Sequence, residues 1–417
     1  MAVDAIPQPE LAQIEQIGGA DLVIGVLEPG RIGGVSAAAQ MVREALGRLS
    51  QEVRAVVVCR DCGGDSEIPP VGEPASPSIT FFNLPEPEAA RTPLENLIDS
   101  YFAILTVGGK LGARACGVIG SESRATGAQP LVYRLVQPLL ELRFDLVMPR
   151  YGRQKMEGLL NRSILSPLSR ALYGERIQNP MGPDFAVSGK LLKKILEQDD
   201  RRRGTPMHPV PSITSAAVCG GFQVCESDLG MRIQPPTNWA DLSTLLAVIL
   251  APVFADAERN AAYWQRIRGS KPVPRFGSPE PVPIETGAVD AQRMMESFQL
   301  GTQNLQDVWG SILPPTTLFE LRKLARLPPA EFRMPDGLWA SIVYDFVLGY
   351  RLRTLSRDHL LRSMTPLYLG WIASYAIEMD TATPVEVEAR LERLDAAFEA
   401  RKPYLLSRWR WPDRFNP

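Results

Sequence analysis

Short, nearly continuous apolar runs alternate with amphipathic segments through the first half of the chain. Runs of this kind occupy residues 21–27, 53–59, 79–83, 115–120 and 144–148. An unbroken apolar run is typical of a strand buried on both faces of a parallel sheet, whereas a half-exposed strand alternates apolar and polar positions. The pattern therefore predicts an α/β fold with a mostly parallel sheet.

The segments between these runs carry apolar residues every three or four positions, as helices with one buried face do. They predict helices at residues 35–49, 94–107, 129–142, 159–173 and 191–198. Gly174 follows the fourth helix and is expected to end it. Strand, helix and strand in succession form βαβ units, in which the two strands are parallel and the crossover is right-handed.

After residue 240 the pattern changes to helix after helix. Helices are predicted at 241–268, 338–350 and 384–402, with a proline-rich surface loop at 269–283. We therefore predict an α/β domain over residues 1–240 and a C-terminal helical region over 241–417. The helical region has no cluster of metal ligands or nucleophiles, so its expected role is to cover the α/β domain or to form an oligomer surface.

Composition limits the partners of this chain. Its 417 residues are too many for one ordinary core, and its formal net charge of -2 does not favour nucleic acid or an anionic membrane as the main partner. No apolar run reaches the roughly 18 residues of a membrane span. The N-terminus is acidic and contains proline, unlike a signal peptide. These features predict a cytoplasmic protein that acts on small molecules.

Five scattered cysteines fit a reducing compartment. Cys59 and Cys62 form a CxxC pair, but a zinc site needs a second close pair, and Cys219 and Cys225 are too far apart in sequence to supply one. We expect buried or incidental thiols.

Candidate chemistry gathers where the predicted strands end. In parallel sheets ligands lie beyond the carboxyl ends of the strands, so residues 28–34 and 61–65 should border a site. Glycines at 30, 33 and 34 suggest a dinucleotide fold with Asp61 on the ribose, although the spacing differs from G-x-G-x-x-G. An oxidoreductase therefore stays open as one alternative.

The stretch 144–189 brings polar residues between buried elements, which is typical of a cleft lining. A structural helix followed by a solvated charged loop is the alternative. Together with Ser-Glu-Ser at residues 121–123, its PxYxRxKxEG…N…PLxRALYGxRxxxPxGxDFxxSG pattern resembles the GT-A glycosyltransferases around mannosylglycerate synthase and glucosyl-3-phosphoglycerate synthase. The resemblance covers residues from about 20 to 240 and implies a GT-A fold.

Such enzymes move a sugar from a nucleotide diphosphate donor to a small hydroxyl-bearing acceptor. The resemblance implies that the donor meets the strand ends, at Leu27, Glu28, Asp61, Gly63 and Ser121. It also implies a divalent ion, Mg²⁺ or Mn²⁺, which bridges the diphosphate and is held by an Asp-x-Asp motif and a later histidine.

This sequence departs from the family at the metal positions. Ser121, Glu122 and Ser123 stand at the Asp-x-Asp motif, and Gln234 stands where the histidine is expected. Glu122, Ser123 and Gln234 are thus the candidate ligands of a degenerate site.

The acceptor side keeps the family pattern. Tyr151, Arg153, Lys155 and Glu157 are implied to meet a phosphate or an acidic acceptor. Asn161 and Asp184 are implied to lie near the acceptor hydroxyl or the reacting carbon, as the catalytic candidates. Two functions follow: an active sugar transferase, or a catalytically inactive relative that binds or regulates after losing its metal site.

Overall fold

The computed structural model describes residues 8–27, 34–60, 79–84, 93–120, 130–197, 209–231, 242–278 and 289–411. The chain divides into two compact units. The first comprises residues 1–153, 177–234 and 273–281, and the second comprises 154–176, 235–272 and 282–417. One junction, at 234/235, lies close to the domain boundary expected at 240, but each unit also includes a segment from the other side of that boundary.

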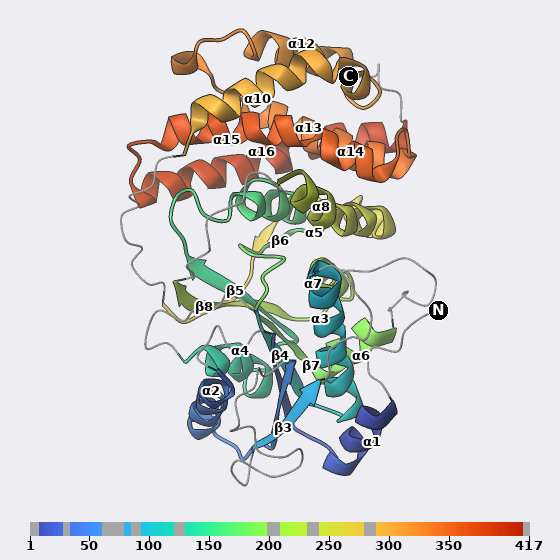
Figure 1. The fold of residues 1–417 in the computed structure, drawn as a ribbon, viewed down its shortest axis with the longest axis vertical. Coiled ribbons are helices and arrows are strands. Elements are labelled where there is room, and N and C mark those ends of the chain that lie inside the picture. Colours follow the sequence, from blue (N-terminus) through green and yellow to red (C-terminus); the bar gives the residue numbers. More distant parts are fainter. Residues whose placement is uncertain are drawn as a thin grey trace. The chain divides into compact units, whose positions relative to one another are not determined.

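An eight-stranded sheet forms the centre of the first unit (Figure 1), in the order β10-β8-β5-β7-β4-β1-β2-β3. Its strands are β1 Leu22–Val26, β2 Ala55–Arg60, β3 Ile79–Leu84, β4 Ala115–Ile119, β5 Leu146–Gly152, β7 Phe185–Ser188, β8 Val224–Met231 and β10 Arg275–Phe276. All neighbours are parallel except β7, which is antiparallel to both β4 and β5. The predicted mostly parallel sheet is confirmed.

Three details of the sheet differ from the prediction. Strand β10 lies within residues 269–283, which were predicted to form a surface loop. The four-residue strand β7 was not expected, since its sequence follows directly on a proline and glycine loop. Pro149 was expected to end its strand, but β5 continues to Gly152. On the β7 side only Leu146 and Val147 are paired, so the N–H that Pro149 lacks is not needed there.

Helices cover both faces of the sheet. Helices α2 (Gly34–Arg48) and α4 (Leu131–Leu140) pack on one face, and α3 (Pro93–Lys110), α6 (Gly189–Glu197) and α7 (Pro209–Cys219) pack on the other (Figure 1). Helix α1 (Gln8–Ile17) contacts α3. A Cβ added to Gly25 would lie 2.4 Å from Ile104 of α3, so glycine permits this close approach.

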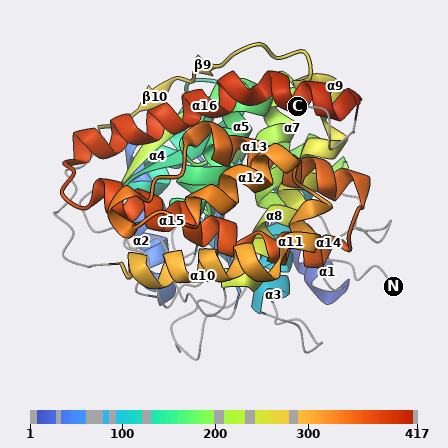
Figure 2. The ribbon, with the colours of Figure 1, turned by 90° about the horizontal axis from the view of Figure 1, so that it is seen from above.

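The second unit is helical, as predicted for the C-terminal half. A π-helical turn (Asn161–Leu165) leads into α5 (Ser166–Tyr173), which Gly174 ends in the left-handed conformation. The long α16 (Pro384–Arg410) packs along α5 and α13 (Asp336–Leu352), as Figure 2 shows. The remaining helices are α8 Leu242–Arg259, α9 Ala261–Trp264, α10 Ala291–Asn304, α11 Gln306–Gly310, α12 Pro315–Leu324, α14 Arg357–Ser363 and α15 Thr365–Met379.

Two short strands, β6 (Glu175–Arg176) and β9 (Lys271–Pro272), pair within this second unit. No helix among the described residues is long and apolar enough to cross a membrane.

Candidate functional site

The carboxyl ends of β1 and β4 meet at one edge of the sheet. The chain passes from β1 to β2 on one side, while β4 lies on the other side of β1, so this edge is the topological switch point at which ligands bind in open α/β sheets. Leu27, a predicted donor residue, lies here and donates its N–H to the carbonyl of Ile119 at 3.1 Å.

Several predicted residues lie in the segments that follow these strands. The structure does not describe residues 28–33, 61–78, 121–129 and 232–241. The predicted donor and metal residues outside the described ranges are Glu28, Asp61, Gly63, Ser121, Glu122, Ser123 and Gln234. Their roles stay predictions.

Asp184 reaches the switch point from the start of β7. Its carboxylate is fully buried, and Oδ1 accepts the backbone N–H of Gly120 at 2.7 Å. Oδ2 accepts the hydroxyl of Tyr151, which lies near the end of β5 and is also buried. The structure thus brings together two residues that the sequence placed in one stretch, and both hold the chain at the end of β4.

The loop at 177–184 is held by hydrogen bonds to several elements of the first unit. The Asn179 amide donates to the carbonyl of Pro149 in β5 at 3.0 Å. Thr214 of α7 donates its hydroxyl to the carbonyl of Pro180 at 2.6 Å, and Tyr101 of α3 donates to that of Pro183 at 3.0 Å. A loop braced in this way presents Asp184 with little freedom, which is what a preorganised site requires.

Arg153 lies beside this loop and directly follows strand β5. Its Nη2 donates to Oδ1 of Asn179 at 2.9 Å, and its guanidinium carbon lies 5.4 Å from the centre of the Tyr151 ring. A guanidinium held over an aromatic ring and by an amide is oriented for an anionic ligand. Asn179 was not among the predicted site residues, although it precedes the Pro-Met-Gly-Pro sequence of the same loop.

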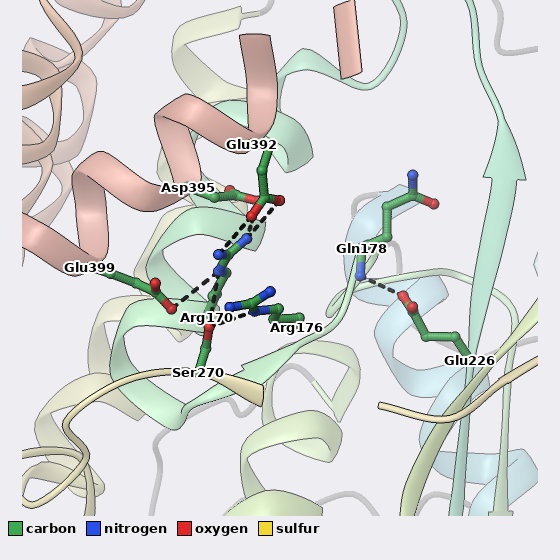
Figure 3. Close-up of polar contacts among 8 residues, drawn as sticks. All are labelled: Arg170, Arg176, Gln178, Glu226, Ser270, Glu392, Asp395 and Glu399. Carbon is green, nitrogen blue, oxygen red and sulfur yellow. Dashed lines mark hydrogen bonds and ion pairs between the residues drawn. The ribbon is translucent and has the colours of Figure 1, made fainter. Parts of the chain in front are cut away.

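Glu226 of β8 holds the other end of the loop (Figure 3). It is fully buried, and its Oε1 accepts the N–H of Gln178 at 2.5 Å. Burial raises the pKa of Glu226, while the Gln178 N–H and the charges of Arg150 and Arg275 act in the opposite direction. No sequence pattern singled out Glu226, because a carboxylate within a strand can be recognised as a site residue only when its partners are known.

Three predicted acceptor or catalytic residues belong to the second unit. Lys155 donates to the carbonyls of Met379 and Asp380, at 3.2 and 2.6 Å, at the C-terminus of α15. Glu157 accepts the N–H of Gln154 at 2.9 Å within its own turn. Asn161 begins the π-helical turn. These contacts give Lys155 and Glu157 structural partners, and binding roles for all three stay predictions.

An ion cluster around a buried arginine links α5 to α16 in the second unit (Figure 3). Arg170 is almost fully buried and pairs with Glu392, Asp395 and Glu399 of α16, at 2.8, 3.2 and 3.1 Å. Burial raises the pKa of Asp395 to about 7, Arg170 lowers it, and the charges of Glu392 and Glu399 add to the rise. The sequence pattern did not single out this cluster, because its members are more than 200 positions apart.

Within the described ranges, no group of three or more His, Cys, Asp or Glu side chains is arranged to hold a metal ion. The residues that the resemblance assigns to an ion lie outside those ranges. Cys59, Cys116 and Cys225 are buried, as the sequence predicted for these thiols.

No family model matches the sequence, and no curated protein matches it. Among solved structures, the chain is similar to glucosyl-3-phosphoglycerate synthase from Mycobacterium tuberculosis. The complex with Mn²⁺, uridine diphosphate and phosphoglyceric acid gives a TM-score of 0.35 at 15% identity, over 60% of this chain and 82% of that one. The complex with Mn²⁺, UDP-glucose and phosphoglyceric acid gives a TM-score of 0.35 at 16% identity, over 61% of this chain and 85% of that one. The complex with Mg²⁺ and uridine diphosphate gives a TM-score of 0.35 at 15% identity, over 60% of this chain and 83% of that one. At these identities and TM-scores the similarity does not establish a function for this chain.

Proposed function

We propose that the protein is a glycosyltransferase that moves a sugar from a nucleotide diphosphate donor to a small acceptor bearing a hydroxyl and an acidic group. In this reaction the bond between the anomeric carbon and the diphosphate oxygen breaks, and the nucleoside diphosphate leaves with the bonding electron pair. A bond to the acceptor oxygen forms, and the proton of the acceptor hydroxyl passes to the departing diphosphate or to solvent. The protein must hold donor and acceptor next to each other for this exchange.

One observation carries the proposal: the buried Tyr151–Asp184 pair holds Gly120 at the switch point, with Arg153 beside it. Nucleotides bind at this edge in open α/β sheets. A guanidinium suits a phosphate or a carboxylate, because its donors match two oxygens at once. The arrangement therefore supports a donor at the ends of β1 and β4 and an anionic acceptor group near Arg153.

Within this proposal the donor, ion and acceptor sites are formed by different residues. The donor meets the segments that carry Leu27, Glu28, Asp61, Gly63 and Ser121, and an ion, if the donor brings one, meets Glu122, Ser123 and Gln234. Arg153 binds the acidic acceptor. Asp184 acts as a positioning residue, because its two oxygens accept hydrogen bonds from Gly120 and Tyr151.

A thermal-shift panel of UDP, GDP and ADP sugars, each with and without Mg²⁺ or Mn²⁺, tests the donor site. A ligand that binds only the folded state stabilises it by about 2.7 kcal/mol at one hundred times its Kd. We expect one nucleotide class to raise the Tm. If a metal ion strengthens that shift, Glu122→Gln should abolish the strengthening, whereas Glu197→Gln on the exposed end of α6 should not.

Turnover tests the reaction itself, with phosphoglyceric acid, the ligand of the similar solved structures, as the first acceptor. Arg153→Met should raise the acceptor KM by about 10- to 100-fold, as loss of a charged hydrogen bond of about 1.5–3 kcal/mol implies. Arg114→Met, an exposed arginine that pairs with Asp21, is the matched control. Donor binding without transfer to any acceptor or to water would favour the inactive relative, and no shift from any donor would overturn the proposed site.

A further inference from the structure

Tyr151 makes two contacts of different kinds with two parts of the candidate site. Its hydroxyl donates to Oδ2 of Asp184, while its ring lies 5.4 Å from the guanidinium carbon of Arg153. A change in the ring position therefore affects both the carboxylate and the guanidinium.

Asp184 transmits that position to the backbone at the end of β4. Its Oδ1 accepts the N–H of Gly120, the last described residue before the Ser-Glu-Ser segment. A Cβ added to Gly120 would lie 2.6 Å from Cβ of Pro183, so this backbone lies directly against the loop that carries Asp184. Movement of the loop must therefore displace the backbone at Gly120.

The two linking side chains are shielded from water. Asp184 is 0% exposed and Tyr151 is 6% exposed. Hydrogen bonds in a low-dielectric interior are stronger than at the surface and are not replaced by bonds to solvent. Such a pair transmits a displacement instead of absorbing it.

We infer that Tyr151 and Asp184 are positioning residues that couple an anion bound at Arg153 to the backbone at Gly120. The inference rests on the proposed function, in which Arg153 meets the acceptor and the segment after Gly120 meets the donor. Occupation of one side then orders the other, and the effect is reciprocal, because coupling between two binding equilibria works equally in both directions.

Hydrogen exchange of the full chain, with and without inorganic phosphate as the probe, tests the coupling. In the wild type, phosphate should slow exchange in peptides that contain the Gly120 amide. Tyr151→Phe should speed exchange there by about 3- to 10-fold without phosphate, as expected for loss of one hydrogen bond, and should remove most of the phosphate effect. Asp184→Asn, which keeps the side-chain shape, provides a second variant with the same expectation.

Matched controls separate coupling from general loosening. Tyr133→Phe makes the same change at an α4 tyrosine whose hydroxyl has no hydrogen-bond partner among the described residues. Asp145→Asn alters a carboxylate that accepts one hydroxyl, from Ser188, and one backbone N–H, from Gln223, at the opposite edge of the sheet. Neither control should change exchange at Gly120.

Wild-type exchange at Gly120 that does not respond to phosphate would overturn the coupling, as would a Tyr151→Phe variant that responds like the wild type. Neither outcome requires a nucleotide sugar. A chain that shows the phosphate effect but binds no donor would keep the coupling and lose the proposed function, so the two failures are distinguishable.

Discussion

Arg170 occupies a buried position where three carboxylates of α16 surround one guanidinium. Arg170 is buried, whereas Glu392 is mostly exposed and Asp395 and Glu399 are partly buried. Removing the cation should therefore cost less than the loss of one partner from a fully buried pair, about 1–3 kcal/mol. We expect Arg170→Met to lower the free energy of unfolding by that amount at pH 7, measured by urea denaturation.

An exposed pair supplies the contrast at the same scale. Arg48 and Glu44 pair at 2.7 Å on the surface of α2, with about half of each side chain exposed. Arg48→Met should change the free energy of unfolding by less than about 0.5 kcal/mol. Equal losses in the two variants would contradict the role assigned to burial.

Lys155 shows how a residue's partners decide its role. In sequence it belongs to the alternating charged stretch that suggests an acceptor site. In the structure its ammonium donates to two carbonyls at the end of α15, where a cation also meets the negative end of the helix dipole. This contact gives Lys155 a structural partner, and its role in acceptor binding stays a prediction.

At the scale of elements, Gly174 determines where α5 ends. Its φ is +80°, and an added Cβ would lie 2.8 Å from Cγ2 of Ile267 and 3.0 Å from the carbonyl of Gly269. Gly174→Ala should therefore destabilise the protein by about 1–3 kcal/mol through strain and crowding, measured by thermal or urea unfolding.

Gly337→Ala is the matched control for that change. Gly337 lies in α13 with an ordinary helical φ and no neighbour within 4 Å of an added Cβ. Alanine there should be neutral or stabilise by up to about 1 kcal/mol. If both substitutions have the same sign, the capping role of Gly174 is wrong.

At the scale of the molecule, neither compact unit is one continuous segment. A chain cut at residue 240 would lose β10, whose Arg275 contacts Glu226 at 3.3 Å in the first unit. It would also lose α16, whose carboxylates surround Arg170 in the second unit. Expression of residues 1–240 alone would leave buried charges of both units without partners.

Two aspartates of the second unit, the buried Asp345 and the partly buried Asp395, make the stability of the chain depend on pH. Burial raises the pKa of Asp395 to about 7 against the opposing charge of Arg170, and it raises the pKa of Asp345 to about 7 against that of Arg408. Both pKa values lie above the ordinary value of 3.8. Between pH 3.8 and about 7, the folded state therefore binds more protons than the unfolded state. Their contribution to the free energy of unfolding is full below the pKa of the unfolded state and is lost as the pH rises through about 7.

Asp395→Asn should therefore flatten the decline in the free energy of unfolding between about pH 4 and pH 7. Urea denaturation at several pH values measures this slope. Asp358→Asn, at an exposed aspartate of α14, should leave the slope as in the wild type. An unchanged slope in Asp395→Asn would show that another group dominates this pH range.

The sequence alone determined the elements of this protein and the class of its fold. Continuous apolar runs predicted strands β1 to β5, and three- and four-residue periodicity predicted the helices, because both patterns reflect burial of local segments. The stretch from Tyr151 to Asp184 was also chosen from sequence, since polar residues between buried elements are a local feature.

Only the tertiary structure decided which partners these residues have. It inserted β7 antiparallel between β4 and β5, and it placed Asp184 on Gly120 and Tyr151. It also assigned Lys155 to a helix end and revealed Glu226, Asn179 and Arg170. These contacts join residues up to more than 200 positions apart, and such pairings depend on how buried surfaces fit together, which no local pattern of hydrophobic and polar positions records.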